Sequence, residues 1–133
     1  MSDTLSVSVQ RGTDGRRHDH FEVPRLPAQT VLDVVTWIQR EADPTLAYRF
    51  ACRVGMCGSC AMTVNGTPRW TCRTRVERAA PDGRLVLEPL RNMPVVKDLV
   101  VDMAPFFAKW TAARGVFSPR DDLGEDFAVV PPA

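Results

Sequence analysis

Apolar and polar residues alternate at the start of the chain. Every second position of the first segment is apolar, at Leu5, Val7 and Val9. This period of two is typical of a strand with one buried face. The turn residues at 12–15 and the apolar pair Phe21 and Val23 predict a second strand near 17–23, which Pro24 and Pro27 end.

The apolar spacing becomes helical after Pro27. Apolar residues now recur at i, i+3, i+4 and i+7, at Val31, Val34, Val35 and Ile38. Thr30 and Asp33 resemble a capping box, so we expect the helix to begin at Thr30.

Short strands are expected again in the second half of the chain. Residues 61–64 predict a strand, Asn65-Gly66 a hairpin turn, and residues 70–74 its return partner, which carries Cys72. Asp82-Gly83 precedes a further strand at 85–87. These elements predict an α+β fold.

A last apolar stripe predicts a helix after Pro94, which Pro105 should kink or break. Its members are Val96, Leu99, Val100, Met103, Phe107 and Trp110. Beyond Gly115, an acidic and proline-containing tail could dock on a partner or on its own domain. Its acidic residues are Asp121, Asp122, Glu125 and Asp126.

Composition fits one small domain. The chain has 133 residues, 44% of them hydrophobic, and no apolar run approaches the roughly 18 residues of a membrane span.

The net charge is only +1, yet residues 49–78 contain a single acid, Glu77, and six arginines: Arg49, Arg53, Arg69, Arg73, Arg75 and Arg78. They could tune a bound anionic group, help to dock an acidic partner, or form an ordinary solvated face. Nucleic-acid binding is not expected, because the pI is modest and few aromatics interleave with the arginines.

The four cysteines of the chain lie within one short segment, at Cys52, Cys57, Cys60 and Cys72. The spacing C-x4-C-x2-C with a later fourth cysteine is the plant-type pattern that holds a 2Fe-2S cluster through four thiolates. A structural zinc site, a disulfide and a C-x-x-C dithiol are the alternatives. Each is weaker: Cys52 and Cys72 form no second short pair, and the first four residues show no basic or apolar region, so we do not expect a secretory leader.

The residues between the cysteines suit a tight loop around a cluster. Gly55, Gly58 and Ser59 are expected to shape the loop and to supply backbone donors to sulfur. Val54 and Met56 are expected to shield the site from water.

Arginines near the cysteines and two histidines of the second strand are further polar residues of interest. Arg49, Arg53 and Arg73 are expected to tune the potential or to assist docking. His18 and His20 lie on one face of the second strand, and we interpret them as surface residues.

The element order predicts a β-grasp, 2Fe-2S ferredoxin-like domain with an additional C-terminal helix and an extended tail. The expected divisions are 1–92, 93–114 and 115–133. Residues 51–62 and 71–74, together with 93–103, resemble the N-terminal half of the succinate dehydrogenase/fumarate reductase iron–sulfur subunit. This resemblance covers roughly residues 5–110.

The resemblance implies a one-electron carrier without an active site of its own, bound to a flavoprotein dehydrogenase or reductase subunit. FAD is expected only on that partner. The family's second domain, with two further clusters, is not matched here, so we expect this chain to hold a single cluster. We also expect the chain to be complete and not a truncated subunit. A cytoplasmic location is expected, with any membrane association through partner subunits. Two alternatives remain: a free ferredoxin that shuttles electrons between a reductase and an oxygenase, and a zinc-stabilised adaptor.

Overall fold

The computed structural model describes residues 3–115, so the expected acidic tail lies outside the described residues. The chain divides into two compact units, Met1–Asp102 and Met103–Ala133. The first unit therefore extends ten residues beyond the boundary at residue 92 that the sequence suggested.

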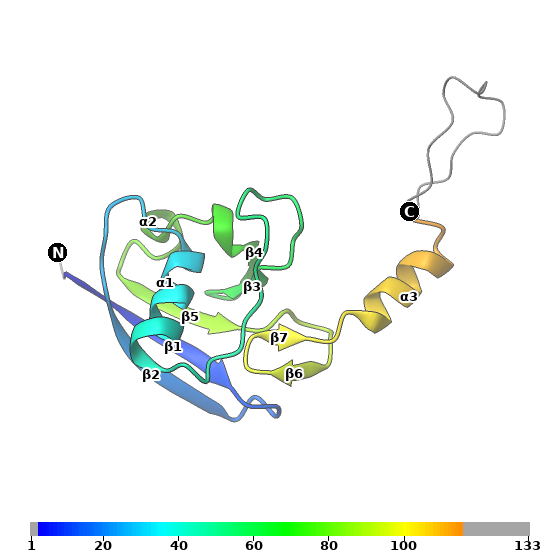
Figure 1. Ribbon diagram of the computed structural model, residues 1–133, viewed down its shortest axis with the longest axis horizontal. Helices are drawn as coiled ribbons and strands as arrows, with labels where there is room; N and C mark the ends of the chain where they lie inside the picture. Colours follow the sequence, from blue (N-terminus) through cyan, green and yellow to red (C-terminus); the bar gives the residue numbers. More distant parts are fainter. Residues whose placement is uncertain (1–2, 116–133) are drawn as a thin grey trace, which may run out of the picture. The chain divides into compact units, whose positions relative to one another are not determined.

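The first unit contains a mixed sheet, a short second sheet and several helical turns (Figure 1). Its strands are β1 (Thr4–Arg11), β2 (Arg17–Pro24), β3 (Ala61–Val64), β4 (Thr67–Trp70), β5 (Arg84–Glu88), β6 (Val95–Lys97) and β7 (Val100–Val101). Its helical segments are α1 (Val31–Trp37), the π-helical turn η1 (Ile38–Ala42), the 3₁₀ turn η2 (Thr71–Arg73) and α2 (Val76–Ala79). The second unit contributes α3 (Ala104–Ala112).

The main sheet has five strands in the order β2-β1-β5-β3-β4. β1 pairs with β5 in parallel, and the other neighbouring strands are antiparallel. Helix α1 packs on this sheet, and the apolar face of the helix joins the buried face of β1 in one core (Figure 1). The α+β, ferredoxin-like fold and the first two strands are thus confirmed.

The start of α1 follows the sequence prediction. Thr30 Oγ1 accepts a hydrogen bond from Asp33 N at 3.1 Å, and Asp33 Oδ2 accepts one from Thr30 N at 3.0 Å. Both bonds of a capping box are therefore present, so two backbone N–H groups of the first turn have partners.

The predicted return strand at 70–74 is wrong in position. Asn65 and Gly66 have φ values of 47° and 83°, as a two-residue hairpin turn of the primed type requires. The return strand begins at once with Thr67 and ends at Trp70, which pairs with Ala61. Cys72 consequently lies on the 3₁₀ turn η2 and not on a strand.

The predicted helix from residue 95 is also wrong over its first half. β6 and β7 form a small antiparallel hairpin there, with the buried residue Asp98 in the left-handed region at φ 53°. The Asp98 carboxylate accepts hydrogen bonds from Gly12 N at 2.7 Å and Ala47 N at 2.9 Å, which fixes the turn. Helix α3 begins only at Ala104, so Pro105 falls in its first turn, where proline is tolerated.

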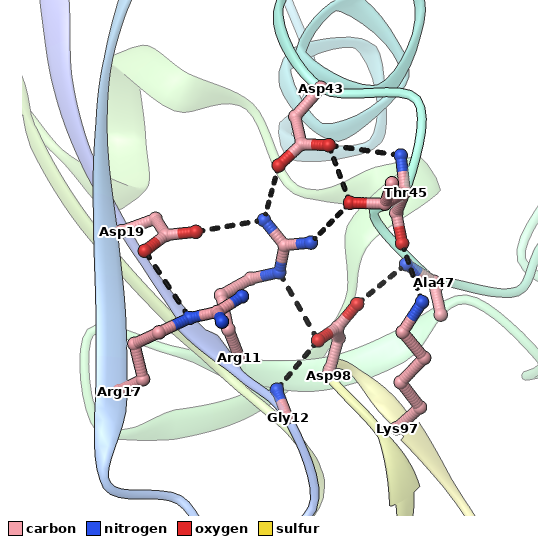
Figure 2. Close-up of polar contacts among 9 residues, drawn as sticks. All are labelled: Arg11, Gly12, Arg17, Asp19, Asp43, Thr45, Ala47, Lys97 and Asp98. Atoms are coloured by element: carbon pink, nitrogen blue, oxygen red, sulfur yellow. Dashed lines mark hydrogen bonds and ion pairs between the residues drawn. The ribbon is translucent and has the colours of Figure 1, made fainter.

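A buried arginine joins several of these segments (Figure 2). The Arg11 side chain, at the end of β1, is 2% exposed. Its Nη1 donates to Asp19 Oδ2 at 3.0 Å and to Asp43 Oδ2 at 2.7 Å, and its Nη2 donates to Thr45 Oγ1 at 2.9 Å. Its Nε lies 3.1 Å from Asp98 Oδ1. The network therefore ties β1, β2 and the β6–β7 hairpin to the segment that leads into the cysteine loop.

Candidate iron–sulfur site

The β3–β4 hairpin brings the last two cysteines together. Cys60 immediately precedes β3 and Cys72 lies just after β4, so the pairing of Ala61 with Trp70 places them near one another. Both are buried in a small cluster with Leu32 of α1. The neighbouring Thr71 Oγ1 donates to the buried carbonyl of Cys60 at 2.9 Å, which closes the hairpin end.

The first two cysteines lie on the loop between η1 and β3. Three backbone N–H groups donate to Cys52 Sγ: Val54 N at 3.4 Å, Met56 N at 3.3 Å and Cys57 N at 3.3 Å. Hydrogen bonds to the charged form stabilise a thiolate, and they lower the pKa of Cys52. The backbone of this loop is therefore shaped around a sulfur anion.

Cys57 is the exposed member of the set. Its Sγ lies 3.0 Å from Ser59 Oγ and accepts a hydrogen bond from Ser59 N at 3.5 Å. The Ser59 hydroxyl is the largest cause that lowers the pKa of Cys57 to about 6, and the backbone of Cys52, the Ser59 N–H group and the Cys52 thiol lower it further. Burial, followed by the contact with the Cys60 thiol, raises the pKa of Cys72.

The thiols thus form two contacting pairs, Cys52 with Cys57 and Cys60 with Cys72. Within residues 3–115, no three His, Cys, Asp or Glu side chains converge on a single ion position. A 2Fe-2S cluster distributes four thiolates over two irons, and the paired arrangement with N–H donors aimed at sulfur fits that group. When bound, such a cluster supplies one-electron oxidation and reduction.

Left-handed backbone lets the loop turn sharply. Gly55 and Gly58 have φ values of 75° and 72°, in the region that glycine adopts at little steric cost, and their role in shaping a cluster loop stays a prediction. A Cβ atom at Gly55 would lie 3.1 Å from Cγ of Arg73, so this glycine also makes room for that side chain. Arg53 has φ 60°, a conformation that costs a non-glycine residue free energy and that the sequence did not indicate.

The three predicted tuning or docking arginines have different surroundings. Arg49 Nη1 donates to the carbonyl of Val101 at 2.9 Å, which anchors the loop to β7. The Arg53 guanidinium lies 4.7 Å from the centre of the Phe50 ring. Arg73 lies against the loop at Gly55. Their roles in tuning or docking stay predictions.

Two expectations about neighbouring residues have opposite outcomes. Val54 and Met56 are 57% and 81% exposed, so the prediction that they shield the site is wrong. The loop directs several N–H groups at sulfur and leaves these two apolar side chains exposed. His18 and His20 are exposed on β2, at the sheet edge opposite the β3–β4 hairpin, as expected of surface residues.

Sequence reasoning missed the contributions of Thr71 and Trp70. Trp70 is half exposed, and its Nε1 would lie 3.7 Å from a Cβ at Gly58, so the indole flanks the cysteine loop. Their position directly before Cys72 was the signal in the sequence that could have pointed to them.

In the described part of the chain, no helix has the length and apolarity needed to cross a membrane.

Known proteins share this sequence and fold. The chain is 46% identical over 94 residues to the fumarate reductase iron-sulfur subunit of Mycobacterium tuberculosis, covering 71% of this chain and 38% of that protein. It is 40% identical over 91 residues to a mitochondrial succinate dehydrogenase [ubiquinone] iron-sulfur subunit of Oryza sativa, covering 68% and 32%.

A chain of the Mycobacterium smegmatis Sdh1 complex in the apo form superposes with a TM-score of 0.81 at 32% identity, over 98% of this chain and 55% of that chain. This chain thus spans only part of the length of these relatives. A family model described as a 2Fe-2S iron-sulfur cluster binding domain matches residues 4–108. The chain therefore belongs to the family of 2Fe-2S iron-sulfur cluster binding domains.

Proposed function

We propose that the chain is a one-electron carrier, acting as the iron–sulfur electron-transfer component of a flavin-dependent dehydrogenase or reductase complex. Cys52, Cys57, Cys60 and Cys72 are the proposed ligands of its single cluster. One observation carries the proposal: the thiols lie in two pairs, and backbone N–H groups donate hydrogen bonds to Cys52 and Cys57 of the first pair.

The relatives supply the kind of complex. Their names describe iron-sulfur subunits of fumarate reductase and succinate dehydrogenase, and this chain spans 38% and 32% of their lengths. We transfer that role to this chain as part of the proposal. The flavin is then carried by a partner subunit, which handles a two-electron substrate, while this chain's cluster passes single electrons. The cytoplasmic location expected from the sequence belongs to the same proposal.

The chain's own residues have defined parts in this function. The N–H groups of Val54, Met56 and Cys57 stabilise negative charge at Cys52, and Ser59 does so at Cys57. Because reduction adds an electron to the thiolate-bound centre, these donors favour the reduced state. Thr71 and Leu32 hold the buried pair in place.

The ligand assignment is tested on anaerobically purified protein. Two irons and two acid-labile sulfides per chain are expected, with the visible absorption and reduced-state EPR signal of such a centre. Cys57→Ser should bleach the absorption or shift the EPR signal. Met56→Ser, which changes an exposed loop residue outside the ligand set, is the matched control and should leave both unchanged. Identical spectra for wild type and Cys57→Ser would reject the assignment.

The partner assignment is tested by native affinity purification followed by flavin and iron assays. We expect this chain to co-purify with a larger flavin-containing chain. Isolation as a free monomer that accepts electrons from several reductases would instead support the shuttle ferredoxin.

A further inference from the structure

Four arginines converge on one hollow beside the cysteine loop. Arg69 belongs to β4, Arg73 to η2, and Arg75 and Arg78 to the start and body of α2. Together with Thr74 and Ala79 they line a cavity of about 300 Å³. Because β4, η2 and α2 follow one another without a long connection, the local fold concentrates these charges in one place.

The positive charge of this hollow is not balanced by acids. Within residues 3–115, none of the four guanidinium groups forms an ion pair with a carboxylate, whereas Arg11, Arg16 and Arg17 all do. The one neighbouring acid, Glu77, lines a different hollow with residues 25–29 and 76. Like charges held close together destabilise one another, so a bound anion would relieve this repulsion.

The hollow also approaches a proposed cluster ligand. Arg73 and Arg75 line a second cavity of about 180 Å³ together with Cys72, Thr30 and Ala28. The same two arginines therefore border both cavities. A negative charge held by these two exposed arginines would lie close to the buried pair of thiols and would act on it electrostatically.

Shape and chemistry indicate the class of ligand. A guanidinium presents parallel N–H donors that match the two oxygens of a carboxylate or phosphate. The site is concave, and four such groups from a ten-residue segment surround it, which suits a small compact anion better than a broad protein surface.

We propose that this arginine hollow, defined by Arg69, Arg73, Arg75 and Arg78, binds a small multivalent oxyanion of the phosphate or dicarboxylate class. Bound anion lowers the reduction potential of the neighbouring cluster, because it disfavours the arrival of an electron. This second statement depends on the proposed electron-carrier function, whereas the binding itself does not.

Calorimetric titration of the full-length, cluster-loaded chain at low ionic strength tests the binding. The probes are inorganic phosphate, pyrophosphate and succinate, which separate the phosphate source from the dicarboxylate source. The double variant Arg75→Gln/Arg78→Gln should weaken binding of the preferred probe by about tenfold or more. Arg75→Lys keeps the charge but loses the guanidinium fork, and should bind with intermediate affinity.

Arg16→Gln is the matched control, because it removes one exposed arginine from the β1–β2 turn and should leave the affinity unchanged. Equal weakening by Arg16→Gln would mean a non-specific charge effect and would overturn the site. Absence of binding by all three probes, or binding only of an acidic peptide such as oligoglutamate, would also overturn it.

Redox titration followed by EPR provides the second readout. Saturating anion should shift the potential of the wild type to more negative values and should not shift that of Arg75→Gln/Arg78→Gln. A normal cluster signal without any anion binding would refute the arginine site while leaving the proposed function intact. Anion binding to a chain that holds no cluster would support the arginine site and would contradict the proposed electron-carrier function.

Discussion

Arg11 is the residue on which the polar interior of the first unit depends. It continues the alternation of Leu5, Val7 and Val9, so the period of two already directs this position to the buried face. The charge of an arginine side chain argues against burial at this position. The sequence could not indicate the compensation, because Asp43 and Asp98 lie 32 and 87 positions away and meet Arg11 only in the folded chain.

Asp98 should make the stability of this unit sensitive to acid. Burial raises its pKa, but the N–H groups of Ala47 and Gly12 and the Arg11 guanidinium outweigh burial, and the net pKa is lowered. The carboxylate therefore contributes stability above its unfolded pKa of about 4, and this contribution is lost as the pH falls through the lower folded value. Asp98→Asn should lower the free energy of unfolding at pH 7 by about 3 kcal/mol.

Thermal unfolding followed by circular dichroism between pH 7 and pH 3 checks this prediction. The wild type should lose stability on acidification, and Asp98→Asn should show a flatter dependence. Glu41→Gln changes an exposed acid on η1 and should behave as the wild type does. Parallel curves for wild type and Asp98→Asn would contradict the prediction.

The cysteines should differ in reactivity once iron has been removed. Cys57 is exposed, and Ser59 lowers its pKa to about 6, so it is mainly thiolate at pH 7. Cys72 is buried, with a raised pKa. Iodoacetamide should therefore label Cys57 well before Cys72, as peptide mass spectrometry can measure. Ser59→Ala should slow the labelling of Cys57 at pH 7, and equal rates at both cysteines would contradict the structure.

Helix α1 is the element that local sequence specified most completely. Its apolar spacing, its N-cap at Thr30 and both capping-box bonds agree with the prediction from Thr30 and Asp33. Thr30→Ala removes the side-chain acceptor for Asp33 N and should cost about 1 kcal/mol of unfolding free energy. Denaturant unfolding measures the loss, and Thr30→Ser, which keeps the hydroxyl, should retain most of the stability. An unchanged midpoint for Thr30→Ala would show that the cap is dispensable.

The β6–β7 hairpin shows where local pattern is ambiguous. Val96, Leu99 and Val100 satisfy helical spacing, but a short apolar run rich in valine fits a strand as well. Tertiary contacts decide between them, because the Asp98 carboxylate accepts hydrogen bonds from Gly12 N, just after β1, and from Ala47 N. Single-sequence periodicity contains no information about those distant donors.

At the scale of the whole molecule, the cysteine spacing predicted the chemistry of the site but not its geometry. The β3–β4 hairpin decides that Cys60 meets Cys72, and the residues that follow it place Arg73 and Arg75 beside Cys72. The return strand was placed three residues too late, so these relations could not be obtained from the sequence.

Removal of the cluster should weaken the first unit as a whole. The four proposed ligands connect the loop before β3 to the turn after β4, and Cys72 packs against Leu32 of α1. Metal binding of this kind is coupled to folding, so anaerobic chelation should lower the apparent midpoint of thermal unfolding by about 5 °C or more. Reloading with iron and sulfide should restore it, and identical midpoints would contradict this coupling.

The parallel pairing of β1 with β5 has a consequence for how the chain is made. Ser6 pairs with Arg84, so one edge of β1 stays without its neighbour until nearly eighty further residues have left the ribosome. All four cysteines emerge within that interval. A nascent chain therefore carries β1 with unpaired backbone N–H and C=O groups while the four cysteines emerge, and such an edge favours aggregation until β5 pairs with it.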